Sequence, residues 1–174
     1  MSFSQITLGE DAPQLINAVI EIPKGSHCKY EYDEDLDEIR LDRVLHSPVY
    51  YPADYGFIPH TRAEDGDHLD VLVILSDPLF PGCVVKVKPI GLLDMEDEGG
   101  RDCKIIAVAQ GDPNNKNLND VSDIEEHFKK EVQHFFEVYK KLENKWVKIR
   151  NWHNKSKALD VIRSAQKRFE DEQT

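Results

Sequence analysis

The sequence predicts an α+β fold that is mainly β: a small closed barrel or sandwich of short strands, with two packed helices in the last third. Short apolar or alternating runs separated by Pro, Gly and Asp fill the first two thirds of the chain. After Ser122 the hydrophobic period changes to three or four residues, and no linker or repeat divides the two parts. A chain of 174 residues can bury roughly 70% of its unfolded surface in one core, so we expect residues 1–174 to form a single domain.

The strands are predicted from short runs that are either wholly apolar or alternate between apolar and polar residues. Many such runs in a small chain, each ended by a turn-forming residue, are typical of a barrel or a sandwich. The aromatic segment 50–57 is interrupted by Pro52 and Gly56, and we expect it to be a loop that covers one end of the barrel. The predicted strands are 18–22, 28–32, 38–44, 71–75, 84–88 and 104–108.

Two helices are predicted in the last third of the chain. The first begins at Ser122, where Ser122 and Glu125 match the pattern of a capping box. A second, less regular apolar stripe predicts a helix from about residue 156 to 169. The first stripe consists of Ile124, Phe128, Val132, Phe135, Tyr139 and Leu142, and the second of Leu159, Ile162, Ala165 and Phe169.

Charge and cysteine usage narrow the classes of function. The chain has 22 basic and 33 acidic side chains and a formal charge of −11. Nucleic acid and anionic membranes select Lys- and Arg-rich faces, so neither is an expected partner. Cys28, Cys83 and Cys103 lack the spacing of a zinc or redox site, and we expect reduced thiols. With no leader-like or membrane-spanning run, the sequence predicts a soluble cytoplasmic protein.

An acidic turn, residues 65–70, carries three carboxylates and leads directly into an apolar strand. Carboxylates this close repel one another unless a cation holds them together, and Mg²⁺ takes oxygen ligands of this kind. A calcium-binding EF-hand loop is the nearest alternative. It fits poorly, because Leu69 and Asp70 stand at the fifth and sixth positions and a strand follows instead of a helix.

A second acidic segment, residues 94–104, lies between two predicted strands with Gly99 and Gly100 near its centre. Taken alone, it is typical of a polar hairpin loop. Together the two segments offer enough oxygens for several divalent ions. Two metals roughly 3.5–4 Å apart can activate water and neutralise a leaving group.

Cations and phenols could complete a phosphate site. Alternation places Lys29 and Glu31 on one face of a strand, where they could also form an exposed ion pair. Arg43 shares a face with Ile39 and Leu41, and a guanidinium on an apolar face needs a carboxylate or phosphate partner. The tyrosines of segment 50–57 could pack or donate to phosphate, and Tyr139 and Lys140 have the same ambiguity.

Taken together, these residues resemble soluble family I inorganic pyrophosphatase of the bacterial type. The resemblance runs from about Ala18 to the second predicted helix and agrees in order and spacing. The residues that carry it are Glu21, 29–31, Arg43, 51–56, 65–71, Asp97, 102–104, Tyr139 and Lys140.

The resemblance implies a metal site and a general base. By similarity, Asp65, Asp70 and Asp102 would bind the first activating Mg²⁺ ions, and Asp97 and Asp102 would bind those that arrive with the substrate. Asp67 would be the general base that takes the proton of the attacking water. Several Mg²⁺ ions per site are implied, with Mn²⁺ or Zn²⁺ as substitutes.

The resemblance also implies the substrate contacts. Lys29, Arg43 and Tyr55 would hold the leaving phosphate, and Lys104, Tyr139 and Lys140 the electrophilic one. Glu21, Glu31 and Tyr51 would be supporting residues, the two acids by orienting water on the metals.

The implied protein is an OB-like barrel that hydrolyses inorganic pyrophosphate to two orthophosphates without a covalent phosphoenzyme, as a cytoplasmic homohexamer. Two other classes stay open at this stage. One is a metal-dependent phosphohydrolase acting on organic phosphates such as nucleotides. The other is an OB-like module for single-stranded nucleic acid, which the charge of −11 opposes.

Two positions depart from the family pattern. His68 stands where proline is usual, and Asp54 stands where asparagine is usual. We expect the His68 imidazole to face solvent with little effect. Asp54 would add negative charge near the site and could alter metal affinity or pH dependence.

Overall fold

Six strands form the main sheet, and five of them close into a ring. The computed structural model describes residues 2–174. The sheet order is β1-β4-β5-β7-β6-β8, and an additional pairing of β1 with β6 closes the ring, while β2 and β3 form a separate two-stranded hairpin. The strands are β1 (Ile16–Ile22), β2 (Cys28–Asp33), β3 (Glu38–Val44), β4 (Asp54–Ile58), β5 (Leu69–Ile74), β6 (Val84–Asp97), β7 (Gly100–Ala109) and β8 (Val147–Asn154).

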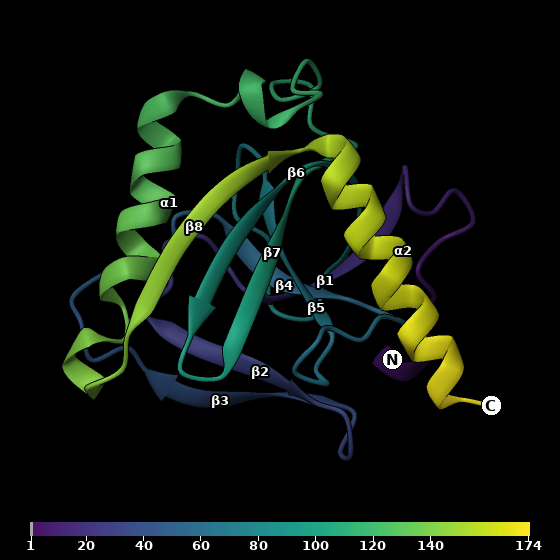
Figure 1. Cartoon of the computed structure of the whole chain (residues 1–174), viewed down its shortest axis with the longest axis horizontal. Helices are drawn as coiled ribbons and strands as arrows, with labels where there is room; N and C mark the ends of the chain where they lie inside the picture. Colours follow the sequence, from purple (N-terminus) through teal and green to yellow (C-terminus); the bar gives the residue numbers. More distant parts are fainter. Residues whose placement is uncertain (1) are drawn as a thin grey trace.

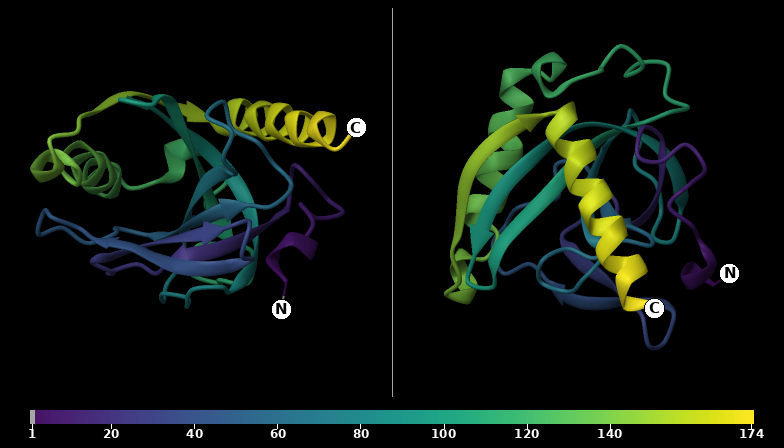
Figure 2. Two further views of the ribbon diagram at one scale, coloured as in Figure 1. Left: turned by 90° about the horizontal axis from the view of Figure 1, so that it is seen from below. Right: turned by 45° about the vertical axis from the view of Figure 1, so that its right-hand side comes forward.

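Helical segments complete the fold. They are the helices α1 (Glu126–Val138) and α2 (Lys155–Glu172) and the short 3-10 turns η1 (Phe3–Gln5), η2 (Val121–Asp123) and η3 (Lys141–Glu143). Figure 1 shows α1 and α2 on opposite sides of the strands, with the β2–β3 hairpin running below them. The two further views in Figure 2 show the hairpin as a layer of its own that faces the α1 side of the molecule. The predicted mainly-β, α+β fold with two helices is confirmed.

The sheet is covered on both faces, which explains the unbroken apolar run of residues 71–74 in β5. Val71 and Val73 of β5 pack in a cluster that contains Ile162 of α2, whereas Leu72 packs in a second cluster that contains Phe136 of α1. Successive side chains of a strand point to opposite faces, so both faces of β5 are dry. A strand buried on both faces is selected as an unbroken apolar run rather than an alternating one.

Strand β4 corrects the prediction of a loop over segment 50–57. It is buried along its whole length and pairs with both β1 and β5. Gly56 is not a turn residue here: a Cβ at this position would lie 1.9 Å from the carbonyl oxygen of Val19. Glycine therefore permits the close approach of β1 and β4.

Strands β6 and β7 are longer than predicted, and β8 was not predicted at all. The acidic segment 94–104 is mostly paired strand, since Asp97 pairs with Gly100 and only residues 98 and 99 form the turn. Strand β8 pairs along β6 with a register shift between Asp94 and Met95. It escapes recognition because charged residues separate its few apolar ones and only one of its edges is paired.

The helices correct the predicted boundaries. The capping box is formed by Asp120 and Asp123 around η2, not by Ser122 and Glu125, and α1 begins at Glu126. The stripe also ends earlier than predicted, because Leu142 lies in η3 and is 64% exposed. Helix α2 agrees with the prediction to within a few residues. No helix among residues 2–174 is long and apolar enough to cross a membrane.

Candidate active site

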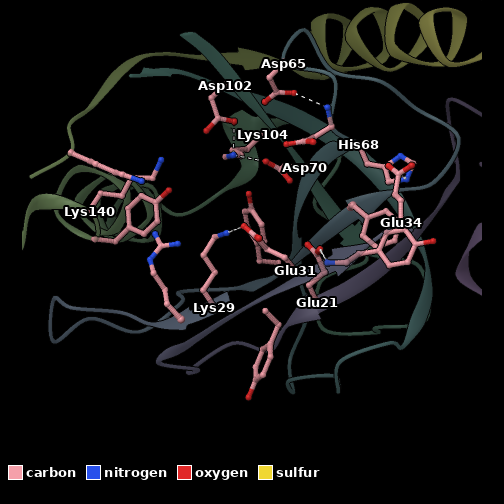
Figure 3. A pocket seen from close by; sticks show the side chains of 18 residues that line it. Glu21, Lys29, Glu31, Glu34, Asp65, His68, Asp70, Asp102, Lys104 and Lys140 are labelled. Carbon is pink, nitrogen blue, oxygen red and sulfur yellow. Dashed lines mark hydrogen bonds and ion pairs between the residues drawn. The ribbon is translucent and has the colours of Figure 1, made fainter. Parts of the chain in front are cut away.

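A pocket of about 380 Å³ lies between the β2–β3 hairpin, strands β5 and β7, and the segment that follows α1. Figure 3 shows acidic and basic side chains from these elements pointing into it. All the predicted site residues except Asp97 and Tyr51 line the pocket. These are Glu21, Lys29, Glu31, Arg43, Tyr55, Asp65, Asp67, Asp70, Asp102, Lys104, Tyr139 and Lys140.

Lys104 lies at the centre of the acidic wall. The parallel register of β5 and β7 places Asp70 opposite Lys104, and Asp102 projects from the same face of β7 two residues earlier. The Nζ atom of Lys104 lies 2.5 Å from Asp70 Oδ2 and 2.5 Å from Asp102 Oδ1. Burial opposes the charge of this ammonium, but Asp70, Tyr55, Asp102 and Tyr139 together raise the pKa of Lys104 well above its usual 10.5.

The acidic turn is shaped by its own backbone. Gly66 has a φ of 95°, a left-handed conformation that glycine adopts without strain. Asp65 Oδ1 accepts a hydrogen bond of 3.1 Å from the N–H of Asp67, and the carbonyl of Asp67 accepts one of 2.8 Å from the N–H of Ala63. Burial, and then the charges of Asp65 and Asp70, raise the pKa of Asp67.

The hairpin supplies the basic wall of the pocket. Lys29 and Arg43 are cross-strand partners, with a register irregularity between Lys29 and Tyr30. Lys29 is paired with Glu31 and lies 3.4 Å from Asp42 Oδ2. The ion pair that alternation allowed for Lys29 and Glu31 is therefore present, and both residues line the pocket.

Arg43 has the carboxylate partners that its position requires. It pairs with Asp42, and its Nε atom lies 2.8 Å from Oε1 of Glu143, whose side chain is only 9% exposed. The predicted apolar face around Arg43 is wrong, however, because Leu41 is 57% exposed.

Glu21 is a buried acid at a bulge in β1. Its Oε1 atom accepts a hydrogen bond of 2.7 Å from the N–H of Tyr32. Burial, and then the charge of Asp70, raise the pKa of Glu21 from its usual 4.5 to about 8. Although Lys29 and Lys104 lower this pKa, burial outweighs them, and the carboxyl group keeps its proton near neutral pH.

Tyr139, Lys140 and Asp97 meet at the end of α1. Tyr139 is the C-cap residue of α1. Its side chain is buried, and its ring stacks on that of Phe135. Lys140 Nζ lies 2.7 Å from Asp97 Oδ2, which places Asp97 at the edge of the pocket although it does not line it. Tyr51 is buried behind Tyr55, with ring centroids 5.6 Å apart, and supports the pocket wall.

The donor set fits hard divalent cations. Among residues 2–174, no three His, Cys, Asp or Glu side chains are grouped so that they could hold a metal ion by themselves. Asp65, Asp67, Asp70 and Asp102 nevertheless line one pocket. Burial raises the pKa of Asp102 despite the neighbouring Lys104, and Asp70 adds to the rise. Divalent cations would relieve this repulsion, and carboxylate oxygens are the ligands that Mg²⁺ takes.

The structure corrects the interpretation of both unusual positions. His68 does not face solvent: its side chain is 12% exposed and its ring stacks on Phe57, 5.0 Å away. Asp54 does not line the pocket, and its carboxylate accepts hydrogen bonds from the N–H groups of Lys24 and Leu79. Asp54 is thus a buried acceptor for two loop amides.

Several pocket residues were not among the predicted ones. Tyr32, Glu34, Phe57, His68 and Lys145 also line it. Lys145 could have been suspected from its place five residues after Lys140, in a basic segment. The others depend on contacts between distant parts of the chain that no local pattern signals.

The sequence of this chain is similar to those of known inorganic pyrophosphatases. Residues 18–170 match the family model described as inorganic pyrophosphatase. The chain is 48% identical over 171 residues to the inorganic pyrophosphatase of Thermus thermophilus, covering 97% of this chain and 98% of that protein. It is 51% identical over 160 residues to that of Saccharolobus solfataricus, covering 90% and 93%.

Solved structures agree with these sequence relatives. The crystal structure of the Thermus thermophilus inorganic pyrophosphatase superposes with a TM-score of 0.95 at 47% identity, covering 98% of this chain and 99% of that one. The inorganic pyrophosphatase of Helicobacter pylori gives a TM-score of 0.91 at 41% identity, covering 95% and 99%. The OB-like barrel with two helices is therefore confirmed as the fold class.

The raised pKa of Glu21 predicts how the stability of the metal-free protein depends on pH. The folded state binds the proton of Glu21 more tightly than the unfolded chain does. The stabilisation is therefore complete below pH 4.5 and is lost as the pH rises through about 8. Glu21→Gln removes this dependence and keeps an oxygen that can accept from the N–H of Tyr32.

Thermal unfolding of the chelator-treated protein between about pH 5 and pH 9 measures the effect. We expect the midpoint of the wild type to fall, relative to that of Glu21→Gln, as the pH rises. The control is Glu137→Gln, at an exposed position on α1. Parallel curves for wild type and Glu21→Gln would rule out a raised pKa at this site.

Proposed function

The chain belongs to the inorganic pyrophosphatase family, and we propose from this premise how the pocket hydrolyses pyrophosphate to two orthophosphates. The observation that carries the proposal is the meeting of several carboxylates with several cations, among them the buried Lys104, in one pocket. Pyrophosphate with its metal ions needs both: oxygen ligands for the metals and donors for the phosphate oxygens. The family relationship gives no support to the alternatives of a nucleotide phosphohydrolase or a nucleic-acid-binding module.

The family depends on divalent metal ions, and we propose Mg²⁺, several ions per site, with Mn²⁺ or Zn²⁺ as substitutes. Asp65, Asp70, Asp97 and Asp102 would hold them, a choice supported by the chemistry of these side chains and by their place at the pocket. When bound, such ions neutralise phosphate oxygens and make water a better nucleophile.

The cations and phenols of the pocket would hold the two phosphoryl groups. Lys29, Arg43 and Tyr55 would bind the leaving phosphate, and Lys104, Tyr139 and Lys140 the electrophilic one. Each of these four cations is paired with a carboxylate. The same ammonium and guanidinium groups would donate to the phosphate oxygens of the substrate.

Asp67 would act as the general base. As the oxygen of water forms a bond to one phosphorus atom, the bond from that phosphorus to the bridging oxygen breaks, and Asp67 takes the proton of the water. Its raised pKa favours this transfer. Glu21 and Glu31 would orient water on the metal ions, and Tyr51 would hold Tyr55 in place by packing against its ring. No covalent phosphoenzyme is needed.

We further propose that residues 1–174 act as a single domain and that the protein works in the cytoplasm as a homohexamer, without a nucleic acid or membrane partner. The resemblance to bacterial family members supports the assembly and the location. The charge of −11 supports the absence of polyanionic partners.

Phosphate release tests the proposed function. We expect rapid release from pyrophosphate with Mg²⁺, and little from ATP, from a simple phosphomonoester, or from pyrophosphate after chelation. The metals and cations of the pocket fit a short, highly charged diphosphate, which explains the preference. Faster release from ATP than from pyrophosphate, or equal release without divalent metal, would contradict the proposal.

Substitution of the proposed base gives a second prediction. Asp67→Asn removes the proton acceptor and keeps the size of the side chain, so we expect kcat to fall by roughly 10²-fold or more. Mg²⁺ binding, measured by calorimetry, should stay close to that of the wild type. Asp77→Asn is the matched control at an exposed position. Near-normal turnover of Asp67→Asn would exclude this role.

A further inference from the structure

The side chain of His68 is held between the acidic turn and the hairpin. Its Nδ1 atom lies 3.0 Å from the carbonyl oxygen of Thr61, and its Nε2 atom lies 3.1 Å from Oε1 of Glu34. One face of the ring stacks on Phe57 at an interplanar angle of 13°. Figure 3 shows Glu34 and His68 side by side at one end of the pocket. Both nitrogens therefore face acceptors, and because burial lowers the pKa of His68, the neutral ring donates to one of them at a time. This contact and the stacked Phe57 ring confine the imidazole.

The base of the acidic turn is anchored to the rest of the fold. The Thr61 hydroxyl accepts a hydrogen bond of 3.0 Å from the N–H of Leu69 and donates one of 2.5 Å to the carbonyl of Ile58. The N–H of Arg62 donates to the carbonyl of Ala165 in α2 over 2.9 Å. Residues 61 and 62 are thus fixed to β4 and α2 before any contact with the hairpin is considered.

Glu34 joins the hairpin to this anchored segment. It lies between β2 and β3, and its two carboxylate oxygens accept hydrogen bonds of 2.6 and 2.8 Å from Arg62. The Nε atom of Arg62 donates to Glu172 of α2 over 2.8 Å, and its guanidinium carbon lies 5.3 Å from the centre of the Phe169 ring. A bidentate pair within such a network defines geometry better than an isolated surface ion pair does.

Together, Glu34, Arg62 and His68 form a cluster that we call the hairpin clamp. It joins the two walls of the pocket: Asp67 immediately precedes His68 on the acidic wall, and Lys29 stands on the hairpin that Glu34 closes. A change of backbone direction at position 68 would move Asp67. Loss of the contact to Glu34 would free the acidic turn from the hairpin.

We propose that His68 and Glu34 are positioning residues: through the hairpin clamp they hold Asp67 at a fixed place relative to the basic wall of the pocket. This inference rests on the proposed function, since Asp67 is the proposed base. Neither residue would touch the reacting atoms. They act through the direction of the backbone and the separation of the two walls.

The test measures kcat and KM for pyrophosphate with Mg²⁺, together with the thermal midpoint, for wild type, His68→Ala, His68→Pro and Glu34→Gln. The matched control is His127→Ala, which removes an exposed histidine 3.6 Å from Glu131 on α1. Proline is the informative replacement because it fixes φ without the imidazole contacts. His68 has no positive φ, and within residues 2–174 its N–H makes no hydrogen bond that proline would remove.

We expect His68→Ala to lower kcat by about tenfold, a loss typical of a misplaced catalytic group, with a much smaller change in KM. His68→Pro should recover little of that loss, because proline restricts the backbone but cannot make the contact to Glu34. Glu34→Gln should lower kcat in the same way, and the double variant Glu34→Gln/His68→Ala should be no slower than the slower single variant. His127→Ala should match the wild type.

Three results would overturn the inference. One is a kcat for His68→Ala and Glu34→Gln equal to that of His127→Ala. Another is a kcat of His68→Pro close to that of the wild type, which would show that the contact to Glu34 is not needed, and the last is multiplication of the two losses in the double variant. If His68→Ala fails to fold, Glu34→Gln and His68→Pro still decide the matter through their own kcat values. A wild type that does not hydrolyse pyrophosphate refutes the proposed function instead, so the two failures are distinguishable.

Discussion

The buried ammonium of Lys104, held between Asp70 and Asp102, is the interaction on which the rest of the pocket depends. A charge removed from water is tolerated only when it is paired and hydrogen-bonded, and here two carboxylates share one ammonium, each at 2.5 Å. The pairing is set by the parallel register of β5 and β7, which places Asp70 opposite Lys104. A shift of one residue in that register would turn one of the two side chains to the opposite face of the sheet.

The same principle of paired charges extends along both walls. Lys29, Arg43 and Lys140 each have a carboxylate partner. Acidic groups remain in excess in the pocket, where burial, and then the charges of neighbouring carboxylates, raise the pKa of Asp67 and of Glu21. A site with paired cations and surplus carboxylates suits a ligand that brings both phosphates and divalent metals. This is the physical link between the structure and membership of the pyrophosphatase family.

Local sequence was enough to predict the acidic turn and the strand that follows it, because the carboxylates, Gly66 and the apolar run are adjacent. The shared face of Asp102 and Lys104 was not predicted, because segment 94–104 is typical of a polar loop and the predicted strand began only at Lys104. Strand β4 was missed for two reasons. Burial on both faces removes the alternation of apolar and polar residues, and Gly56 is required by the close approach of β1, a tertiary contact that the local sequence does not show. The enclosure of His68 could not be predicted either. Its partner Glu34 is separated from it by the whole of β3 and β4, and Arg62 is held by Glu172 at the far end of the chain.

Lys104 neutralises carboxylates that the proposed metal ions would bind, and it therefore competes with those ions. Calorimetric titration of Mg²⁺ into the Lys104→Met variant without substrate, at the same pH as the wild type, tests this competition most directly. Methionine keeps the length of the side chain and removes its charge. We expect tighter Mg²⁺ binding than in the wild type, because Asp70 and Asp102 have lost their competing cation. Equal or weaker Mg²⁺ binding by a folded Lys104→Met variant would contradict it.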